Sequence, residues 1–303
     1  MTVAPKISVI MSVFNGEEFL RETLDCVMAQ NFSDWEMIIV NNCSTDGTQN
    51  VLDEYDDPRI RIISPESHGE IGVGLRLALS QARGEYVAVQ DADDLSLPER
   101  LKDQSKVLDD DDSLGLVSGW YDLIDGQGKK IGEGRPPENQ QELIDAMQVS
   151  NPIAHSACMF RRYATDQSGG YPLEYSYGCD LGLIIRLLKF NWKIAVQPKV
   201  TIKLRQHINQ SSTIAKLSIA RSYDAARVAK EITRIKGASV PSLRLGKRNI
   251  TKRTLQYGMA LAADKQWSMA FRQLVSAILH QPLYALIYLT YCAVKRLGVR
   301  KIS

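Results

Sequence analysis

An α/β fold with a mostly parallel central sheet, followed by a helical C-terminal region, is predicted by three features of this 303-residue chain. In residues 1–110, short apolar runs suited to strands alternate with segments whose apolar residues have helical spacing. This alternation is typical of a parallel sheet with helices on both faces. From residue 214 onward the pattern is helical almost throughout, and the charge of the chain changes sign near residue 240.

The alternation defines most elements of the first part of the chain. The expected strands are residues 7–13, 35–40, 60–63, 85–89, 114–120 and 156–160, with one or two more within 192–204. The expected helices are residues 17–30, 46–55, 71–81, 98–110, 138–148 and 181–190. Residues 126–137, rich in glycine and proline, are expected to form a mobile loop. Because ligands bind at the carboxyl ends of parallel strands, the residues after Val13, Val40 and Val89 are the first candidates for a site.

The composition is that of an ordinary soluble globular protein, with 44% hydrophobic and 24% charged residues. The five cysteines form no CxxC pair, and the first residues lack the basic segment and cleavage site of a secretory signal. These features favour a cytoplasmic location over a secreted disulfide scaffold. No apolar stretch approaches the ~20 residues that span a bilayer, and no nucleic-acid-binding motif is found.

The formal net charge of +2 hides an uneven distribution. Residues 241–303 hold eleven lysines and arginines but only one acidic residue, Asp264, so this tail has a charge of about +10. Residues 1–240 hold 26 basic and 34 acidic residues, a charge of about −8. An acidic body and a basic tail indicate two separate tasks on one chain.

The basic tail is also rich in Trp, Tyr, Leu and Ile between residues 267 and 297. Its longest apolar run, residues 283–294, has only twelve residues, too few to cross a bilayer as one helix. Basic residues flank this run, a pattern typical of a helix in the interface of an anionic membrane. The alternative is a helical cap whose apolar face packs on the α/β domain.

Three acidic residues follow the fourth expected strand, in the sequence QDADD at residues 90–94. In the turn after a strand, Asp91 and Asp93 can converge on one hard cation. Mg²⁺ and Mn²⁺ prefer oxygen ligands and commonly bridge to substrate phosphates. The alternative is a cluster that caps the helix beginning at Pro98. The position at the end of a buried strand favours the metal site.

Two further segments are candidates for nucleotide contacts. Asn41 and Asn42 follow the second strand, and an amide can pair with a base or a ribose, although a role in the turn is the alternative. The glycines of residues 67–76 permit close backbone approach to a ligand. Arg76 in this segment can reach a diphosphate, or lie solvated on its helix.

Together these segments resemble the donor-binding half of family 2 glycosyltransferases, which have the GT-A fold. The resemblance rests on residues 5–15 (PKISVIMSVFN), 35–47 (WEMIIVNNCSTDG), 83–94 (RGEYVAVQDADD) and 98–101 (PERL). It continues at residues 151–153 (NPI), 160–162 (FRR), 169–171 (GGY), 180–187 and 205–207 (RQH). It implies a transferase domain at 1–212, with a nucleotide-sugar-binding half at 1–97 and an acceptor half at 98–212, before a basic helical region at 213–303.

The resemblance also implies roles for individual residues. The donor-contacting residues would be Ser12, Phe14, Asn42 and Asp91, with Arg76 as a further candidate that stands where many members have asparagine. The ligands of Mn²⁺ or Mg²⁺ would be Asp91, Asp93 and His207. Asp180 matches the general base of inverting members, the alternative being a cap for the helix 181–190. The acceptor-side residues would be Trp120 and His155, for which core packing is the alternative.

The chain departs from the family pattern at residues 41–43 and at residues 179 and 182. Residues 41–43 are Asn-Asn-Cys where the family has Asp-Asp-Gly. Asparagine keeps the acceptor oxygen of aspartate but loses its charge. Cys179 replaces the glutamate before the base, and Gly182 replaces the next acidic position. Asp93 and Asp180 are intact, so activity is expected.

The implied function is metal-dependent, inverting transfer of a hexosyl or N-acetylhexosaminyl group from a nucleotide-diphosphate sugar, first of all a UDP-sugar. The expected acceptor is a glycan hydroxyl, in a lipid-linked polysaccharide or O-antigen intermediate at the inner face of the cell membrane. A sugar nucleotidyltransferase is one alternative, but residues 12–20 lack the basic residue of its glycine-rich loop. A non-catalytic relative that binds nucleotide-sugar or scaffolds an assembly is the other, supported only by the departures.

Overall fold

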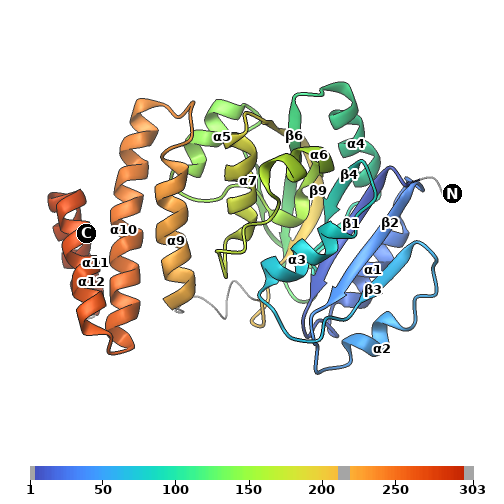
Figure 1. Cartoon of the computed structure of the whole chain (residues 1–303), viewed down its shortest axis with the longest axis horizontal. Coiled ribbons are helices and arrows are strands. Elements are labelled where there is room, and N and C mark those ends of the chain that lie inside the picture. The colour runs from blue at the N-terminus through green and yellow to red at the C-terminus, as the bar shows by residue number, and fades with distance from the viewer. Residues whose placement is uncertain (1–3, 211–218, 297–303) are drawn as a thin grey trace. The chain divides into compact units, whose positions relative to one another are not determined.

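The structure, a computed structural model, describes residues 4–210 and 219–296 and contains two compact units (Figure 1). The first unit, residues 1–143 and 151–210, holds a sheet with helices on both faces. The second unit, residues 144–150 and 211–303, is helical where it is described. The predicted α/β class with a helical C-terminal region is therefore confirmed.

The parallel part of the sheet is formed by the first four strands. β1 (Ile7–Val13) lies between β2 (Trp35–Asn41) and β4 (Tyr86–Val89). β3 (Ile60–Ile63) pairs with the other edge of β2, and all three pairings are parallel. The connecting helices are α1 (Leu20–Met28), α2 (Thr48–Leu52) and α3 (Ile71–Ser80). The carboxyl ends of β1, β2 and β4 thus meet at one edge of the sheet.

Both faces of β1 are buried, which explains its continuous apolar sequence. Ile7, Val9 and Met11 join one hydrophobic cluster with residues of α1, α2 and α4 (Arg100–Asp110). Ser8 and Ile10 point to the opposite face, because side chains alternate along a strand, and they too are buried. A strand buried on both sides fixes the position of the residues that follow it.

The remainder of the sheet is mixed. β8 (Met159–Arg161) pairs antiparallel with β4 and with β6 (Leu114–Ile124). β6 pairs parallel with β9 (Lys193–Arg205), and the short β5 (Leu95–Ser96) pairs antiparallel with β9. The strand order within the described chain is β3-β2-β1-β4-β8-β6-β9-β5. The helices in this part are α5 (Gln140–Met147), the 3₁₀ helix His155–Ala157, α6 (Arg162–Ser168) and α7 (Cys179–Lys189).

The prediction of a mobile loop at residues 126–137 is wrong. Residues 130–134 form β7 (Lys130–Gly134), which pairs antiparallel with β6 in a hairpin. The turn is closed by Asp125, whose Oδ1 accepts backbone N–H bonds from Gln127 at 3.0 Å and Lys129 at 2.9 Å. No β7 residue is fully buried, so its sequence carries no apolar signal. The expected strand at 156–160 is likewise shorter, because residues 155–157 form a 3₁₀ turn.

The helical unit contains α9 (Ile219–Ile232), α10 (Val240–Ala263), α11 (Trp267–His280) and α12 (Pro282–Arg296). Residues 144–150 group with these helices through polar contacts. Asp145 Oδ1 accepts hydrogen bonds from the Ser242 hydroxyl at 2.5 Å and the Ser239 backbone at 2.7 Å. Among the helices in the described part of the chain, none is both long and apolar enough to cross a membrane.

Gly84, just before β4, is expected to be sensitive to any added side chain. A Cβ there would lie 2.5 Å from the Ser8 nitrogen and 2.7 Å from the Ile7 carbonyl carbon, both backbone atoms that cannot move aside. We expect Gly84→Ala to lower the free energy of unfolding by about 2 kcal/mol, measured by urea denaturation. Gly126→Ala is the matched control, because a Cβ there meets no atom within 4 Å. Equal destabilisation by the two substitutions would contradict this packing.

Candidate active site

The acidic turn after β4 is closed by the side chain of Gln90, which is fully buried. Its Nε2 donates to the backbone oxygens of Asp91 at 3.1 Å and Asp94 at 2.8 Å. Its Oε1 accepts a hydrogen bond from the Ser96 hydroxyl at 2.6 Å. One amide therefore spans the turn and fixes the backbone from which the carboxylates project.

Arg100, near the start of α4, also stabilises the acidic turn through its hydrogen bonds. Its side chain is only 2% exposed. Nη2 donates to the backbone oxygens of Val89 at 2.8 Å and Cys158 at 3.0 Å, and Nη1 donates to the Ser96 hydroxyl at 2.8 Å. Burial lowers the pKa of Arg100 to about 10, so the guanidinium remains charged at neutral pH. It thus joins the ends of β4 and β8 and faces the acidic turn with a positive charge.

Asp91 shares its surroundings with two further carboxylates. Its pKa is raised to about 7, first by desolvation and then by the negative charges of Asp93 and Asp180. The charge of Arg100 opposes this rise only in part. Within residues 4–210 and 219–296, no hydrogen bond is made to the Asp91 carboxylate. The structure therefore brings the three predicted aspartates into one concentration of negative charge.

His207 lies directly against Asp93. Its Nε2 is 2.8 Å from Asp93 Oδ2, and its ring packs edge-on to Phe19 with centroids 4.8 Å apart. Its Nδ1 is buried and has no partner in the part of the chain described. Arg205 Nε donates to the Asp93 backbone oxygen at 2.9 Å, which holds the segment after β9 beside the turn.

Asp94, the third acidic residue of the turn, differs from Asp91 because both of its carboxylate oxygens accept hydrogen bonds from the protein. It is 2% exposed, and its Oδ1 accepts the Arg205 backbone N–H at 2.8 Å. Its Oδ2 accepts a hydrogen bond from the Ser156 hydroxyl. Burial, followed by the charges of Asp93 and Asp91, raises its pKa well above the usual range. Asp94 therefore joins the turn to β9 and to the 3₁₀ turn before β8.

Asp180 lies in the first turn of α7 but does not cap it. The residue at the N-cap is Gly178, whose φ of 85° is left-handed. Asn151 Nδ2 donates to Asp180 Oδ2 at 3.0 Å and orients the carboxylate. Two residues further, Gly182 has no room for the acidic side chain of the family pattern, because a Cβ there would lie 2.6 Å from the Pro172 side chain.

Two more predicted residues join this group through Tyr171. His155 Nε2 is 2.9 Å from the Tyr171 hydroxyl, and Arg76 donates from Nη1 to the Tyr171 backbone oxygen at 3.0 Å. Burial lowers the pKa of His155, although the charge of Asp180 opposes this, so the imidazole is neutral near pH 7. The sequence motifs contained Tyr171 and Asn151 but gave neither residue a role, because their partners are distant in the chain.

The predicted donor residues form a second group at the ends of β1 and β2. Phe14 is 49% exposed, and its ring lies 4.3 Å from that of His68. Asn42 is 4% exposed and uses both ends of its amide on Gly69, with Nδ2 donating to the backbone oxygen at 2.7 Å and Oδ1 accepting the N–H at 3.0 Å. Ser12 packs against Gly74, where a Cβ would lie 2.2 Å from its Oγ. Asn42 thus fixes the neighbouring loop and presents little of its own surface.

Cys43 occupies the position where the family pattern has glycine. Its φ of 62° is left-handed, a conformation that glycine adopts without cost. Its thiol donates to the Pro65 backbone oxygen at 3.3 Å. The structure therefore holds a cysteine in a backbone conformation that favours glycine.

Trp120 is part of the β6–β7 hairpin. Its Nε1 donates to the Pro136 backbone oxygen at 3.3 Å, and the Arg135 guanidinium lies 5.3 Å from its ring. The ring is half-buried, and both of these contacts are to residues that follow β7.

The sheet carries an Asp-Ala-Asp turn directly after its fourth strand, and the charge of Asp180 acts on Asp91 in that turn. Residues 8–169 match the model of the family described as "Glycosyl transferase family 2", and the chain belongs to this family.

Curated relatives carry the same class of name. EpsE of Bacillus subtilis (strain 168), provisionally named a glycosyltransferase, is 31% identical over 174 residues, which cover 56% of this chain and 62% of EpsE. TuaG of the same organism, provisionally named a teichuronic acid biosynthesis glycosyltransferase, is 38% identical over 102 residues, 33% of this chain and 40% of TuaG. The matched part is therefore less than two thirds of each relative.

Solved structures share the fold. S. aureus TarS 1-349 in complex with UDP-GlcNAc has a TM-score of 0.67 and 19% identity, covering 91% of this chain and 81% of that chain. The mannosyltransferase PcManGT from Pyrobaculum calidifontis, in complex with GDP-Man and Mn²⁺, has a TM-score of 0.60 and 20% identity, covering 98% of this chain and 81% of that one. The predicted GT-A fold is confirmed.

Loss of Arg100 is expected to destabilise the chain more than loss of an exposed arginine. Arg100→Met keeps a similar volume but removes the buried guanidinium from the Val89 carbonyl and from the Cys158 carbonyl, which retains the Val89 backbone N–H as a donor. We expect the free energy of unfolding to fall by about 3 kcal/mol, measured by urea denaturation. Arg21→Met is the control, because the Arg21–Glu54 ion pair is about half exposed and should contribute little to stability. The two variants unfolding at the same urea concentration would refute this role.

Proposed function

We propose that this chain is a metal-dependent, inverting glycosyltransferase in which Asp91 and Asp93 face the donor diphosphate and Asp180 is the general base. The observation that carries the proposal is the shared environment of these three carboxylates at the end of β4, in a member of family 2. The proposed transferase domain is residues 1–212, with the donor half at 1–97 and the acceptor half at 98–212.

The residues at this turn fit a divalent cation held jointly with substrate. In the described residues, no group of three or more His, Cys, Asp or Glu side chains is placed to hold a metal by itself. Asp91 and Asp93 nevertheless offer carboxylate oxygens in a region of excess negative charge, and Mg²⁺ sites often combine one or two carboxylates with substrate phosphates. When bound, Mn²⁺ or Mg²⁺ would supply Lewis-acid stabilisation of the leaving diphosphate. The complex of PcManGT with GDP-Man and Mn²⁺ supports this choice of ion.

His207 is proposed to complete this arrangement beside Asp93. Its Nε2 contact holds the Asp93 carboxylate in one orientation, and its buried Nδ1 has an unused bonding position among the described residues. A histidine so placed acts either as a ligand or as a support for the ligand, and both roles keep the carboxylate aimed at the cation.

The chain's own acid–base chemistry is assigned to Asp180. During transfer the sugar carbon becomes oxocarbenium-like as the diphosphate leaves. Asp180 accepts the proton of the acceptor hydroxyl, which attacks from the opposite side and inverts the configuration. Asn151 holds the carboxylate in place by its 3.0 Å hydrogen bond, and His155, neutral beside Tyr171, adds no competing positive charge.

The proposed donor is a nucleotide-diphosphate sugar, first of all a UDP-sugar. The complexes of TarS with UDP-GlcNAc and UDP support this choice, while PcManGT with GDP-Man keeps guanine nucleotides in the test set. The exposed ring of Phe14 is available to stack on a base. Arg76 lies on α3 and donates to the backbone oxygen of Tyr171, whose hydroxyl contacts His155. A hexosyl or N-acetylhexosaminyl group is the proposed cargo.

The proposed acceptor is a hydroxyl of a glycan carried on a lipid, handled in the cytoplasm at the inner face of the cell membrane. The name of TuaG, which refers to teichuronic acid, supports a surface polysaccharide. Trp120 and His155 are proposed to lie on the acceptor side, since both belong to the second half of the domain.

A panel of nucleotide sugars with Mn²⁺ tests the proposal against its alternatives. Release of nucleoside diphosphate identifies a transferase and its donor together. Exchange of pyrophosphate into the nucleotide sugar would instead indicate a sugar nucleotidyltransferase. Binding of a nucleotide sugar with neither reaction, in the presence of a panel of glycan acceptors, would favour a non-catalytic relative.

Asp180→Asn is expected to lower kcat by ~10²–10⁴-fold, because the amide cannot accept the acceptor proton. The Kd for the donor, measured by calorimetry, should change little, since Asp180 acts on the acceptor. Asp112→Asn is the matched control, because the Asp112 side chain is 96% exposed. Turnover by Asp180→Asn at the rate of the control would remove Asp180 as the base.

His207→Gln is expected to weaken the apparent affinity for Mn²⁺ by ~10–100-fold, because Asp93 loses the contact that orients it. The measurement is the Mn²⁺ concentration that gives half-maximal donor hydrolysis after treatment with chelator. Saturating Mn²⁺ should restore much of the rate. An unchanged Mn²⁺ dependence would separate His207 from the metal site.

A further inference from the structure

The helical unit exposes an unusual number of large apolar side chains on α11 and α12. They recur at helical spacing along each helix, and they include Trp267, Phe271, Leu279, Leu283, Leu286 and Ile287, all between 57 and 78% exposed. We call this set the α11–α12 surface. Of the fourteen residues of α11, only Ala270 and Ala277 are buried. Monomeric proteins rarely expose contiguous apolar patches of this kind unless the patch binds something.

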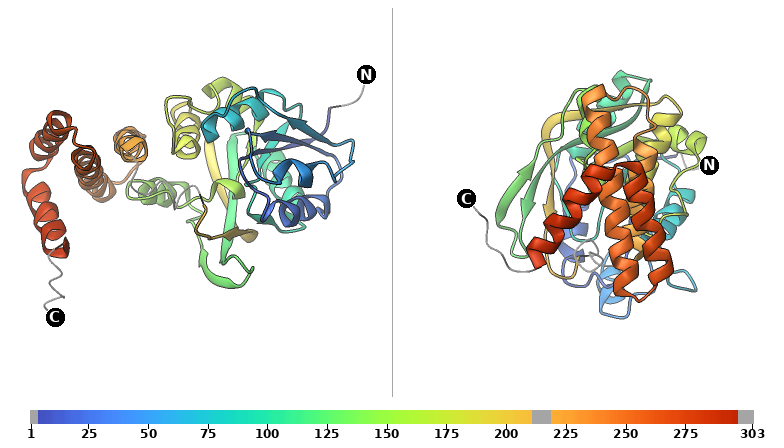
Figure 2. Two further views of the ribbon diagram at one scale, coloured as in Figure 1. Left: turned by 90° about the horizontal axis from the view of Figure 1, so that it is seen from below. Right: turned by 90° about the vertical axis from the view of Figure 1, so that its left-hand side faces the viewer.

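The buried sides of these helices are already packed, so the exposed residues are not needed for the internal core. α10, α11 and α12 lie side by side (Figure 2). Leu255, Ala277 and Ala285 form their shared cluster, with one residue from each helix. Gly258 of α10 allows close contact, since a Cβ there would lie 3.2 Å from Gln273 Cβ and 3.4 Å from the Ala270 oxygen. The α11–α12 surface therefore lies outside the cluster that joins the three helices.

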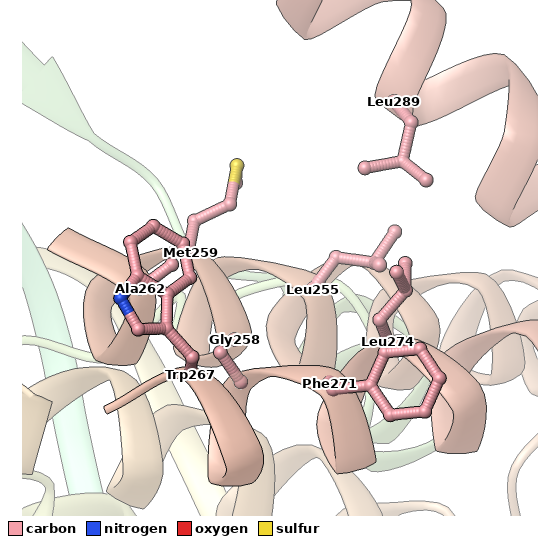
Figure 3. A pocket seen from close by; sticks show the side chains of 9 residues that line it. Leu255, Gly258, Met259, Ala262, Trp267, Phe271, Leu274 and Leu289 are labelled. Carbon is pink, nitrogen blue, oxygen red and sulfur yellow. The ribbon is translucent and has the colours of Figure 1, made fainter. Parts of the chain in front are cut away.

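An apolar cavity of about 450 Å³ lies among the same three helices. Figure 3 shows Leu289 of α12 across this cavity from Leu255 and Leu274. Trp267 and Phe271 belong both to the lining and to the α11–α12 surface. The lining side chains are apolar, apart from the indole N–H of Trp267, so water within the cavity has few hydrogen-bond partners. Hydrocarbon suits such a cavity better than a polar ligand does.

The charge around the surface identifies the occupant. Arg272 on α11, Lys265 before it, and Arg244, Lys247 and Arg248 on α10 are all exposed. Asp264 is the single acidic residue of the tail, and it pairs with Gln266 at 2.7 Å. Exposed Trp, Phe and Leu side chains next to Lys and Arg form the pattern of a segment that lies in an anionic membrane interface. A second copy docking on the same surface would bring two basic tails together.

We propose that the α11–α12 surface docks on an anionic lipid bilayer, and that hydrocarbon of the same bilayer fills the adjoining cavity. The helices lie in the interface, with the apolar side chains among the acyl chains and the basic side chains near the lipid phosphates. This binding is independent of the transferase reaction, because it involves no residue of the acidic site and no nucleotide sugar.

The test is co-sedimentation of the full chain with vesicles of phosphatidylcholine containing phosphatidylglycerol, compared with vesicles of phosphatidylcholine alone. We expect binding to the anionic vesicles at low salt, weaker binding to neutral vesicles, and loss of binding as NaCl screens the charges. Trp267→Phe should remove most of the fluorescence quenching that brominated lipid causes. No binding to the anionic vesicles, or equal binding to both kinds, would overturn the proposal.

Matched triple variants test the surface itself. Leu279→Ser, Leu283→Ser and Leu286→Ser replace side chains 63–78% exposed, so folding should persist, as checked by circular dichroism, while vesicle affinity falls more than ~10-fold. The control combines Ile131→Ser, Tyr163→Ser and Phe190→Ser in the α/β unit, where exposure is 52–61% and affinity should not change. Equal effects of the two variants would overturn the proposal. So would self-association of the wild type, seen by analytical ultracentrifugation, that the leucine variant abolishes without any change in vesicle binding.

Discussion

The guanidinium of Arg100, buried where β4 ends, is the interaction on which the geometry of the acidic site depends. It donates to the last backbone oxygen of β4 and to the oxygen of Cys158 just before β8, and it shares Ser96 with Gln90. A buried arginine is tolerated only when its donors are satisfied, and here five different groups accept from it. The DxD turn is therefore held by neutral carbonyl, amide and hydroxyl groups, which leaves the Asp91 carboxylate unneutralised by a direct ion pair.

That arrangement explains why the three acids of residues 91–94 differ. Both oxygens of Asp94 accept hydrogen bonds, from Arg205 and Ser156, and Asp93 contacts His207. Asp91 instead lies beside the negative charges of Asp93 and Asp180, which raise its pKa. Like charges in a desolvated site raise the pKa of one of them, which is a common feature of functional sites. A cation shared with phosphate would relieve the same field, so the raised pKa of Asp91 and the proposed chemistry have one origin.

The division of charge along the chain corresponds to two structural units with different surfaces. The α/β unit buries its apolar residues in a sheet covered on both faces, and Asp91, Asp93 and Asp180 share one environment at the end of β4. The helical unit buries Leu255, Ala277 and Ala285 between its helices and leaves other large apolar side chains and basic side chains exposed. A transferase that takes its acceptor from a lipid carrier would benefit from both properties, because docking restricts diffusion to the plane in which the acceptor lies.

The sequence by itself determined the order of elements, the α/β class, the family and the position of the acidic turn, because these depend on local apolar periodicity and on short motifs. Only the tertiary structure decided what each polar residue of those motifs does. Asn42, expected to contact the nucleotide, forms hydrogen bonds with the Gly69 backbone through both ends of its amide. Gly178, and not Asp180, is the N-cap residue of α7. The hairpin strand β7 was missed because an exposed edge strand needs no apolar pattern. For Asn42 the outcome depends on a partner 27 residues away in the chain, whose proximity is set by the folded sheet and has no signature in the neighbouring sequence.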